Sequence, residues 1–485
     1  MKSSLNFKVK KDGTIYDLHE LGIWVSSFHI LSPNINREKL SIPGMPGAHL
    51  LATKEEERHV KISLQIETDS IQDFDDLKHT IFDLFYSEKE FSIVRDIKPD
   101  KEIFVLQEGE FDIENLSESD GEFDITLTML DPYIYGPEKE AIFPSDAVSL
   151  DYEGTAPGDP IFELEVLQPV TFAMIQNQND EYMMIGKPTD VIDTPYEKYE
   201  RVFYSDCNNL TGWVTAAPGE IDGNIAGTME TNGTRFQASD FGTGSSWHGP
   251  AIKTSLSEPL TDFRLTAYVG FFNKSVAKQV GRIEIYLLDV NGNQVGKIAM
   301  KDIQSSRSVA WGEARAGDNQ DSHYLINEYG DKPGNWNDFS GHVRIEREGN
   351  VWRAYFAKVD SSGRHHTRRF AEWVDTENKF NRTVAQIVVH HGQYGSHEPV
   401  SGGVYSLNVY KINQEQENEV PYIADVGDII TIDSVAKDIL INGESRKDLK
   451  DFGATFFKLY KGENILTVYP FNSFATRAKY RERYK

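Results

Sequence analysis

Three acidic residues alternate along a short segment in the first quarter of the chain. They are Glu110, Asp112 and Glu114, in the sequence EFDIE. Residues two apart on a β-strand share one face, so these three carboxyl groups would lie together. A retaining glycosidase uses two neighbouring carboxyl groups as its acid and its nucleophile. This segment is therefore the first candidate for catalytic chemistry.

The same segment also fits a purely structural role. It resembles the ExDxE motif of laminarinase-type sandwich enzymes, but GEFDI occurs again at residues 121–125. The two copies predict one hairpin with its acids in water. The residues that would face inward are Phe111, Ile113, Phe123 and Ile125. We expect the hairpin, and no catalytic residue.

The histidines invite a metal-binding interpretation. The candidates are His365–His366, His390–His391 and His397. Adjacent residues on a strand point to opposite faces, so a His-His pair does not chelate one ion. No acidic or cysteine partner stands at ligand spacing. We expect no zinc site.

A second metal-like pattern lies at residues 289–293. Asp289, Asn291 and Asn293 place oxygens at alternate positions, as in part of a calcium loop. The glycine is at position four instead of six, and no Glu stands at position twelve. A hairpin turn at Asn291-Gly292 explains the pattern better. No metal or other cofactor is predicted.

Tryptophans suggest a different kind of chemistry. Six of the seven lie in one segment: Trp213, Trp247, Trp311, Trp336, Trp352 and Trp373. Trp352 and Trp373 have strand-like or apolar neighbours, which is typical of a core. Trp247, Trp311 and Trp336 stand beside Gly, Asn, Asp or His.

A flat ring stacks on a sugar face while nearby amides and carboxylates bond the hydroxyls. We therefore predict carbohydrate binding at Trp247, Trp311 and Trp336, with Tyr394 and His397 as secondary candidates. For Trp336 the alternative is core packing, because GNWNDF leads into a strand.

Composition limits the classes of function. The chain has 485 residues and a formal net charge of −26, so it repels DNA phosphates and no specific nucleic-acid binding is expected. A single cysteine, Cys207, excludes an intrachain disulfide. The N-terminus lacks the apolar stretch of a secretory signal, and no run is long enough to span a bilayer. We expect synthesis in a cytoplasm and no membrane contact.

The elements that position these residues are mostly short strands. Residues 57–67 alternate apolar and polar side chains, which is the period of a strand. Residues 69–87 form the convincing helix, with apolar residues every three or four positions. Asp69 or Ser70 can cap its N-terminus. Residues 40–60 are rich in turns, and an intersubunit arm or an ordinary long loop explains them equally well.

Composition and turn signals divide the chain into four stretches. Residues 1–138 end at the punctuating DPYIYGP, and residues 139–200 start a second domain. Residues 201–412 hold the tryptophans and many strand candidates, typical of a two-sheet sandwich. Residues 413–485 have the same character as the first two stretches and complete the second domain. We therefore predict a mainly β protein in which the third stretch is inserted into a surface loop.

The flanking stretches resemble the distal tail proteins of siphophages that infect Gram-positive bacteria. The resemblance rests on the order of several segments: the helix followed by LDPYIYG, then EGTAPGDPIFELEV and EYMMIGKP, then ITIDSVAKDILINGE, FFKLYKGENILTVYP and the terminal YRERY. It implies an N-terminal β ring domain with one α-helix and a galectin-like β-sandwich. The insert resembles jelly-roll, concanavalin-like carbohydrate-binding modules in its opening segment SDCNNLTGW and its closing strand YSLNVYKI.

The resemblance also implies function and partners. Six copies would form a homo-hexameric ring at the virion tail tip, assembled in the host cytoplasm. The implied partners are the tail tube protein, the tail-associated lysin or fibre protein, the tape measure protein and, through the insert, host cell-wall polysaccharide. It implies no enzymatic activity.

Two alternatives belong to other classes. The insert could be the catalytic sandwich of a wall- or capsule-degrading tail enzyme, but no paired carboxylate stands out within it. The chain could also be a cellular adhesin or lectin, against which the missing secretory signal argues.

Overall fold

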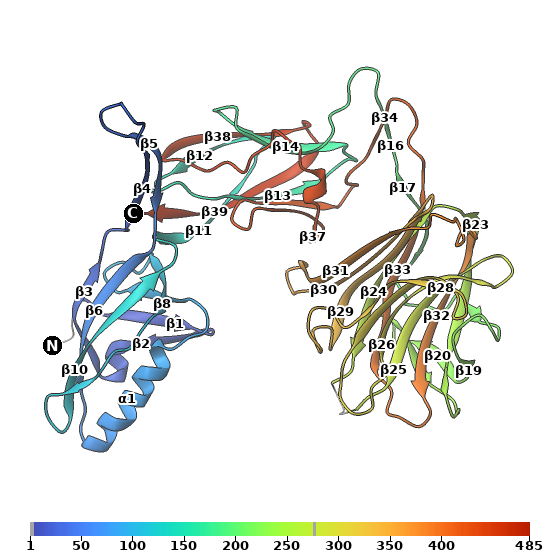
Figure 1. Cartoon of the computed structure of the whole chain (residues 1–485), viewed down its shortest axis with the longest axis horizontal. Coiled ribbons are helices and arrows are strands. Elements are labelled where there is room, and N and C mark those ends of the chain that lie inside the picture. The colour runs from blue at the N-terminus through green and yellow to red at the C-terminus, as the bar shows by residue number, and fades with distance from the viewer. Residues whose placement is uncertain (1–3, 275–277) are drawn as a thin grey trace.

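The computed structural model describes residues 4–274 and 278–485 of the chain. Within them the fold is mainly β, as the sequence predicts, with one α-helix and three large separate hydrophobic cores. The cores belong to an N-terminal domain, a middle domain and an insert that leaves and re-enters the middle domain (Figure 1). The domain limits after residues 138, 200 and 412 remain a prediction.

The N-terminal domain packs two groups of strands around the helix. Strand β6 (Arg58–Glu67) alternates buried and outward residues, which confirms the strand predicted there. It lies between β3 (Ile23–Ile30) and β10 (Asp120–Met129). The other strands of the domain are β1 (Phe7–Lys11), β2 (Thr14–Asp17), β7 (Phe91–Arg95), β8 (Glu102–Gln107) and β9 (Glu114–Asn115).

Helix α1 (Ile71–Phe85) begins at the predicted cap. The Ser70 side chain accepts a hydrogen bond from the Asp73 backbone N–H, which satisfies one of the free donors of the first turn. Phe74, Ile81, Leu84 and Phe85 are buried against the strands. Ile71, predicted on the same face, is instead 52% exposed because it lies in the first turn, at the edge of the packed surface.

The predicted hairpin is confirmed at the end of the EFDIE segment, where Glu114 is its one residue in a strand. Glu114 in β9 pairs with Glu122 in β10, and Ile113 and Phe123 are buried while Phe111 packs at the edge of the core. Glu110, Asp112 and Glu114 are all exposed. Their carboxyl groups are therefore solvated, and the structure gives them no common site.

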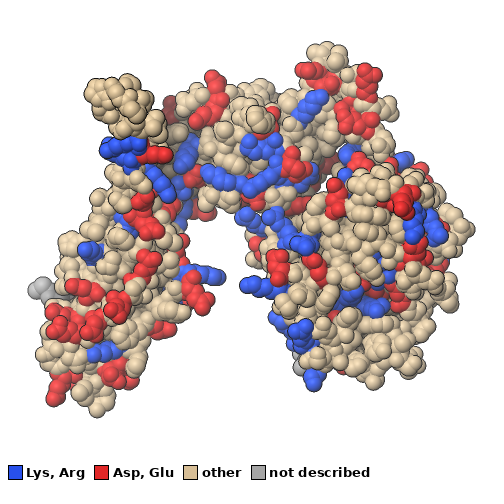
Figure 2. Space-filling view, in the orientation of Figure 1, with Lys and Arg blue, Asp and Glu red and all other residues tan. Residues whose placement is uncertain are grey.

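A two-stranded hairpin projects from the N-terminal domain (Figure 1). It consists of β4 (Ile35–Leu40) and β5 (His49–Glu55), paired with each other in a sheet of their own. Apolar side chains on the strands and at the tip are exposed: Leu40, Ile42, Met45, Leu50 and Leu51. The tip, residues 41–48, carries no charged residue and is tan in Figure 2. We call residues 35–55 the arm.

The middle domain is built from both ends of the same stretch of chain. One sheet continues from the N-terminal domain through β11 (Ile134–Ile142), β39 (Phe474–Tyr484), β13 (Ile161–Val166), β35 (Ile429–Asp433), β36 (Asp438–Ile441) and β37 (Glu444–Ser445). The facing sheet contains β12 (Ala147–Tyr152), β38 (Gly462–Tyr469), β14 (Phe172–Asn177) and β15 (Tyr182–Gly186). The core between the sheets therefore needs residues from both sides of the insert.

Two short strands form the neck through which the chain enters and leaves the insert. They are β16 (Thr194–Tyr196) and β34 (Glu419–Pro421), and they pair in parallel. The neck strands make a sheet of only these two members.

The insert is a sandwich of two large sheets. The eight-stranded sheet contains β17 (Tyr199–Ser205), β20 (Thr228–Thr231), β21 (Phe236–Asp240), β24 (Phe263–Phe272), β29 (Phe339–Glu348), β30 (Val351–Val359), β31 (His365–Val374) and β33 (Ser401–Ile412). The nine-stranded sheet contains β18 (Val214–Thr215), β19 (Asn224–Ile225), β22 (Trp247–Gly249), β23 (Ala251–Leu260), β25 (Gly281–Leu288), β26 (Gln294–Asp302), β27 (Trp311–Gly317), β28 (Ser322–Glu328) and β32 (Val384–Tyr394). Both sheets contribute to one core.

Local predictions within the insert are confirmed. Strands β25 and β26 are joined by the Asn291-Gly292 turn, in which Asp289 Oδ1 accepts the backbone N–H groups of Asn291 and Asn293. The carboxylate that suggested a calcium loop is therefore used by the turn itself. Trp352 is fully buried, and Trp373 packs against the same core while half-exposed.

Candidate functional site

The outer face of the nine-stranded sheet concentrates the polar chemistry of the insert. Side chains of its central strands alternate between the core and the outer face. In β25, the side chains that enter the core are Ile283, Ile285 and Leu287. The intervening residues of these strands lie on the outer face. They are Arg282, Glu284 and Tyr286 on β25, Lys297 and Lys301 on β26, Trp311, Glu313 and Arg315 on β27, and His390 on β32.

Lys297 is the centre of a buried network of charges. Its Nζ lies 3.0 Å from Glu284 Oε1, 2.7 Å from Glu313 Oε1 and 3.1 Å from Asp222 Oδ2. Burial opposes the charge on Lys297, but Glu284 and Glu313 outweigh it and raise the pKa of the ammonium group. Such a cation remains charged because neutralising it would leave an excess of buried negative charge on the three carboxylates around it.

Glu284 has a complete set of partners. Tyr286 donates its hydroxyl to Oε2 at 2.8 Å, and His390 Nδ1 lies 2.7 Å from the same oxygen. Burial acts to raise the pKa of Glu284, but Lys297 and Arg282 outweigh it, so that the pKa lies well below the ordinary value. Glu284 is therefore a fixed anion that orients its neighbours.

Glu313 is the second carboxylate of the same face. No sequence motif indicates that Glu284 and Glu313 share this face. The pKa of Glu313 is raised by burial and lowered more strongly by Lys297 and Lys301. The acid of a glycosidase must hold a proton near neutral pH, which requires a raised pKa. Glu284 and Glu313 are both held ionised, so the pair lacks the proton donor that glycosidic cleavage needs.

Trp247, Tyr394 and His397 lie together at one side of this face. Trp247 pairs with Tyr394 across β22 and β32, and their ring centres are 5.2 Å apart. The His397 ring stacks beside Tyr394 at 6.1 Å. Tyr394 is 40% exposed and Trp247 is half-buried. Three of the five predicted binding residues therefore form one aromatic patch.

Arg282 and Lys301 connect this patch to Trp311. The Arg282 guanidinium lies 3.7 Å from the centre of the Trp247 ring. Arg282 is the strand partner of Lys301, and Lys301 is the strand partner of Trp311. We call Tyr394, Trp247, Arg282, Lys301 and Trp311 the aromatic row. It crosses the sheet from β22 to β27, with aromatic rings at both ends and cations between them.

Trp311 is a half-buried ring at the far end of the row. It packs edge-on against Tyr329 with ring centres 5.2 Å apart. Its Nε1 has no hydrogen-bond partner within the described parts of the chain. That nitrogen is buried, so what the row offers to a hydroxyl-rich ligand is the surface of its rings.

Trp336 does not belong to this surface. It is fully buried, its ring stacks on Phe356 at 5.4 Å, and its Nε1 donates to the Thr367 carbonyl at 3.0 Å. Both its faces and its polar atom are therefore used by the core. The expectation that it stacks on a sugar is corrected to the packing alternative, because the following strand carries the ring inward.

The sequence does contain a signal for the charged residues of the outer face, which the search for binding residues did not identify. RIEIY and WGEAR each place charged or aromatic residues at every second position of an apolar strand, and KIAMK has a lysine at each end of one. Charges at this period within apolar strands indicate an occupied polar face. The pattern does not show which strands are neighbours in the sheet, and so it does not show which of these residues meet.

The histidine pair of β32 divides between two environments. His390 lies on the outer face beside Glu284, whereas His391 lies on the opposite side of the strand. Burial lowers the pKa of His391 to about 3, so it is neutral at physiological pH. Among residues 4–274 and 278–485, no group of three or more His, Cys, Asp or Glu is placed to hold a metal ion.

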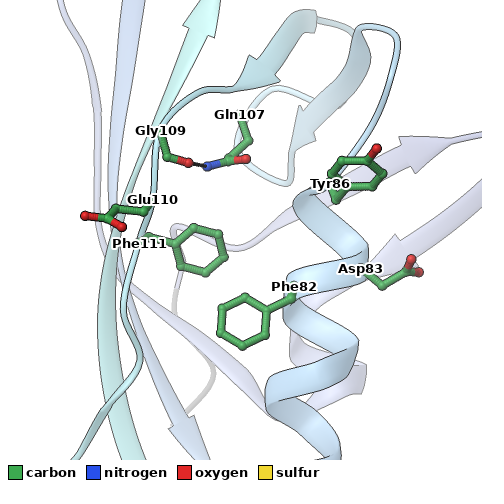
Figure 3. Close-up of a pocket in the computed structure, with 7 residues that line it drawn as sticks. All are labelled: Phe82, Asp83, Tyr86, Gln107, Gly109, Glu110 and Phe111. Atoms are coloured by element: carbon green, nitrogen blue, oxygen red, sulfur yellow. Dashed lines mark hydrogen bonds between the residues drawn. The ribbon is translucent and has the colours of Figure 1, made fainter.

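A cavity of about 550 Å³ lies away from the insert, in the N-terminal domain. It opens between α1 and the segment that precedes EFDIE, and Phe82, Tyr86 and Phe111 form its apolar wall (Figure 3). Asp83 and Glu110 stand at its margin and point away from the rings (Figure 3).

Two parts of the chain match family models of phage tail proteins. Residues 11–129 match the phage tail protein RIFT-related domain, and residues 400–484 match the C-terminal domain of the siphovirus-type tail component. The two matched segments lie on either side of the insert, and the predicted resemblance to distal tail proteins is confirmed. A search of curated proteins finds no match. None of the described helices is long and apolar enough to cross a membrane.

Several solved structures are similar to parts of the chain. The Dit protein of SPP1 is 16% identical over 37% of this chain and 74% of its own, with a TM-score of 0.33. The CBM2 module of the evolved Dit of Lactobacillus casei BL23 phage J-1 is 18% identical over 45% and 99%, with a TM-score of 0.38. The laminarinase of Rhodothermus marinus is 10% identical over 44% and 98%, with a TM-score of 0.31.

The buried and the half-exposed tryptophans should contribute unequally to the unfolding free energy. Replacing Trp336 by Ala empties a fully buried site, and we expect the insert to lose about 3–5 kcal/mol of unfolding free energy. Replacing half-exposed Trp247 by Ala should cost clearly less. Urea denaturation followed by tryptophan fluorescence measures both, and equal losses would contradict the assignment of Trp336 to the core.

The Lys297 network predicts a pH-dependent stability. The pKa of Glu284 in the folded state lies below 4.5, so its stabilising contribution is present above pH 4.5 and is lost as pH falls through the folded pKa. Lys297→Met removes the cation that Glu284, Glu313 and Asp222 share, which leaves buried negative charge in excess, and should cost about 3–5 kcal/mol at neutral pH.

Without Lys297, burial dominates and the carboxylates take up protons more readily, so the deficit of the variant should shrink as the solution is acidified. Denaturation curves at pH 7 and pH 4 test this. Lys411→Met, which removes an exposed cation of the same insert, is the control. A deficit that does not change with pH would contradict the network.

Proposed function

We propose that this chain is a distal tail protein that forms a ring between the tail tube and the tail tip, and that its insert binds saccharide of the host cell wall. The observation that carries the proposal is the arrangement along the chain. Phage tail family matches occupy both ends, and between them lies a sandwich whose outer face presents an aromatic row. The proposed partners are the tail tube, tail fibre or lysin, and tape measure proteins.

The arm supports assembly into a ring. It exposes several large apolar side chains, which are stabilised when another protein covers them. A projecting element that contacts a different surface of the next copy makes a head-to-tail interface, and such interfaces close into rings. We propose six copies, as the family resemblance implies.

Charge supports a conduit for DNA. The chain carries a net charge of −26, and acidic side chains gather over the end of the N-terminal domain that holds α1 (Figure 2). Acidic walls avoid the counterion-releasing contacts by which basic surfaces hold DNA. A ring with such walls lets DNA pass without binding it.

Saccharide binding is supported by the chemistry of the aromatic row. Ring faces bind the apolar faces of sugars, and the Arg282 guanidinium beside Trp247 bonds to hydroxyl or acidic oxygens. The buried network beneath holds Arg282 and Lys301 in place, because each lies beside a fixed carboxylate: Glu284 for Arg282 and Glu313 for Lys301. We propose binding without cleavage, since Glu284 and Glu313 are ionised.

Assembly can be tested on the arm. Leu50→Asp and Leu51→Asp place charges where we propose an apolar contact, so the double variant should shift from ring to monomer. Light scattering and electron microscopy of purified protein measure the change. Ile15→Asp, an exposed apolar residue of the same domain outside the arm, is the control and should still form rings. Wild-type protein that stays monomeric at all concentrations would refute the ring.

Saccharide binding can be tested with purified host cell walls. Trp247→Ala and Trp311→Ala should each weaken binding about tenfold, because an aromatic contact buried on binding contributes about 1.4 kcal/mol. Phe370→Ala removes an exposed ring from the eight-stranded sheet and should have no effect. Cosedimentation with wall fragments gives the affinities. Equal binding by wild type and both tryptophan variants would exclude the aromatic row as the site.

A further inference from the structure

The insert touches the middle domain at a second place besides the neck. The hairpin turn between β36 and β37, Asn442-Gly443, lies against the turn between β30 and β31 (Figure 1). The His365 backbone N–H donates to the Gly443 carbonyl at 3.0 Å. A Cβ added to Gly443 would lie 1.9 Å from the Gly363 carbonyl oxygen. The two backbones therefore meet at a distance that only glycine permits.

Next to this contact lies a bidentate ion pair between the two domains. Arg344 of β29 donates from Nη1 and Nη2 to the two oxygens of Glu444 in β37, at 2.8 and 3.0 Å. Both side chains are mostly covered, at 17% and 23% exposure. Burial raises the pKa of Glu444, but Arg344 outweighs it and lowers the pKa below its ordinary value. The Glu444 carboxylate is ionised, and the planar guanidinium of Arg344 fixes its orientation.

The insert builds a support beneath Arg344 from its own aromatic residues. The Arg344 guanidinium lies 4.8 Å from the Tyr355 ring centre, and the Tyr355 hydroxyl is 3.0 Å from His365 Nδ1. His342 stacks on His365 at 5.0 Å. Burial lowers the pKa of His365 to about 4, so the ring is neutral at physiological pH and adds no charge beside Arg344.

A further cation of the insert faces carboxylates of the middle domain. Arg364 lies 3.6 Å from Asp433 and 3.5 Å from Asp438. These pairs are more exposed than the pair of Arg344 and contribute less. In the ion pairs that cross between the two domains, the arginine belongs to the insert and the carboxylate to the middle domain, and Arg446 and Lys447 of the middle domain lie beside the same carboxylates. Such complementarity selects one orientation of two surfaces.

The neck is too small a connection to restrain rotation of the insert about its axis. It consists of one short parallel pair of strands, and two adjacent strands act as a hinge about their common axis. A second contact away from that axis removes the rotation. We propose that the β36–β37 turn is a clamp, formed by Gly443 and Glu444 on Gly363, His365 and Arg344, that holds the insert in one orientation on the middle domain.

The clamp determines where the aromatic row points. Arg344 and His365 belong to the eight-stranded sheet, whereas the aromatic row lies on the outer face of the nine-stranded sheet. The row therefore lies on the side of the sandwich opposite to the clamp. A closed clamp presents the row away from the middle domain, and an open clamp leaves its direction free. This inference does not depend on ring formation or on the nature of the ligand.

Distance measurements between two spin labels test the clamp in the full-length chain. Ile142→Cys on the middle domain and Val214→Cys on the insert give exposed attachment points. Cys207 is buried and its pKa is raised by burial to about 12, so it does not compete for the label. The unmodified clamp should give one narrow distance distribution by pulsed electron paramagnetic resonance.

Charge reversal should open and then restore the clamp. Arg344→Glu places two carboxylates against each other, and Glu444→Arg places two arginines together, so each should replace the narrow distribution by a broad one. The double variant restores opposite charges and should recover the narrow distribution. Lys411→Glu, which reverses an exposed ion pair within the insert, is the matched control and should leave the distribution narrow.

Unfolding curves establish that each variant is folded. Gly443→Val tests the same contact from the middle domain if Arg344→Glu fails to fold, and it should broaden the distribution in the same way. A folded Arg344→Glu or Gly443→Val variant that keeps the narrow distribution overturns the clamp. A folded double variant that stays broad also overturns it.

Discussion

The pairing of the last strand is the constraint on which the architecture depends. Strand β39 is hydrogen-bonded to β11 along one edge and to β13 along the other. The end of the chain is thereby placed between two strands that precede the insert by many residues. Because both edges of β39 are satisfied, the middle domain is closed with the insert outside it. Strand β11 also contacts β8, so one sheet continues into the N-terminal domain.

This closure explains how a sandwich of about two hundred residues can be carried within another domain. The entropy of closing a loop grows only with the logarithm of its length, so a folded insert adds little cost once β39 is paired. The neck brings both connections to one place, and the insert keeps a core of its own. The middle domain can then accept a module without change to its own packing.

Within the insert, a buried charge network and a partly exposed aromatic row occupy the same face of one sheet. Lys297 compensates several carboxylates at once, and these carboxylates in turn flank Arg282 and Lys301. Burying charges is costly unless geometry and counter-charges are complete, and here the completed network leaves little freedom to the side chains above it. A binding surface that is ordered before contact loses less entropy on binding. The same carboxylates are unsuited to proton donation because their cations hold them ionised.

The amino-acid sequence by itself determined the local elements and their order. Alternation in β6, the capped helix α1, the EFDIE hairpin and the Asn291-Gly292 turn depend on residues close together in the chain. Such patterns are legible because the period of a helix or a strand and the conformations of turn residues are local properties. The family resemblance likewise depended on the order of segments.

Only the tertiary structure decided which side chains meet. His390 and Glu284 are 106 residues apart, and they contact because β32 and β25 are neighbours in the sheet. The neighbourhood of Trp247 and Tyr394, and the burial of Trp336, follow from strand order and from the packing of one sheet on the other. Non-local pairing is set by the collective burial of the core, so a single segment does not contain it. The sequence therefore identified aromatic residues of the right kind, and the fold selected those that share a surface.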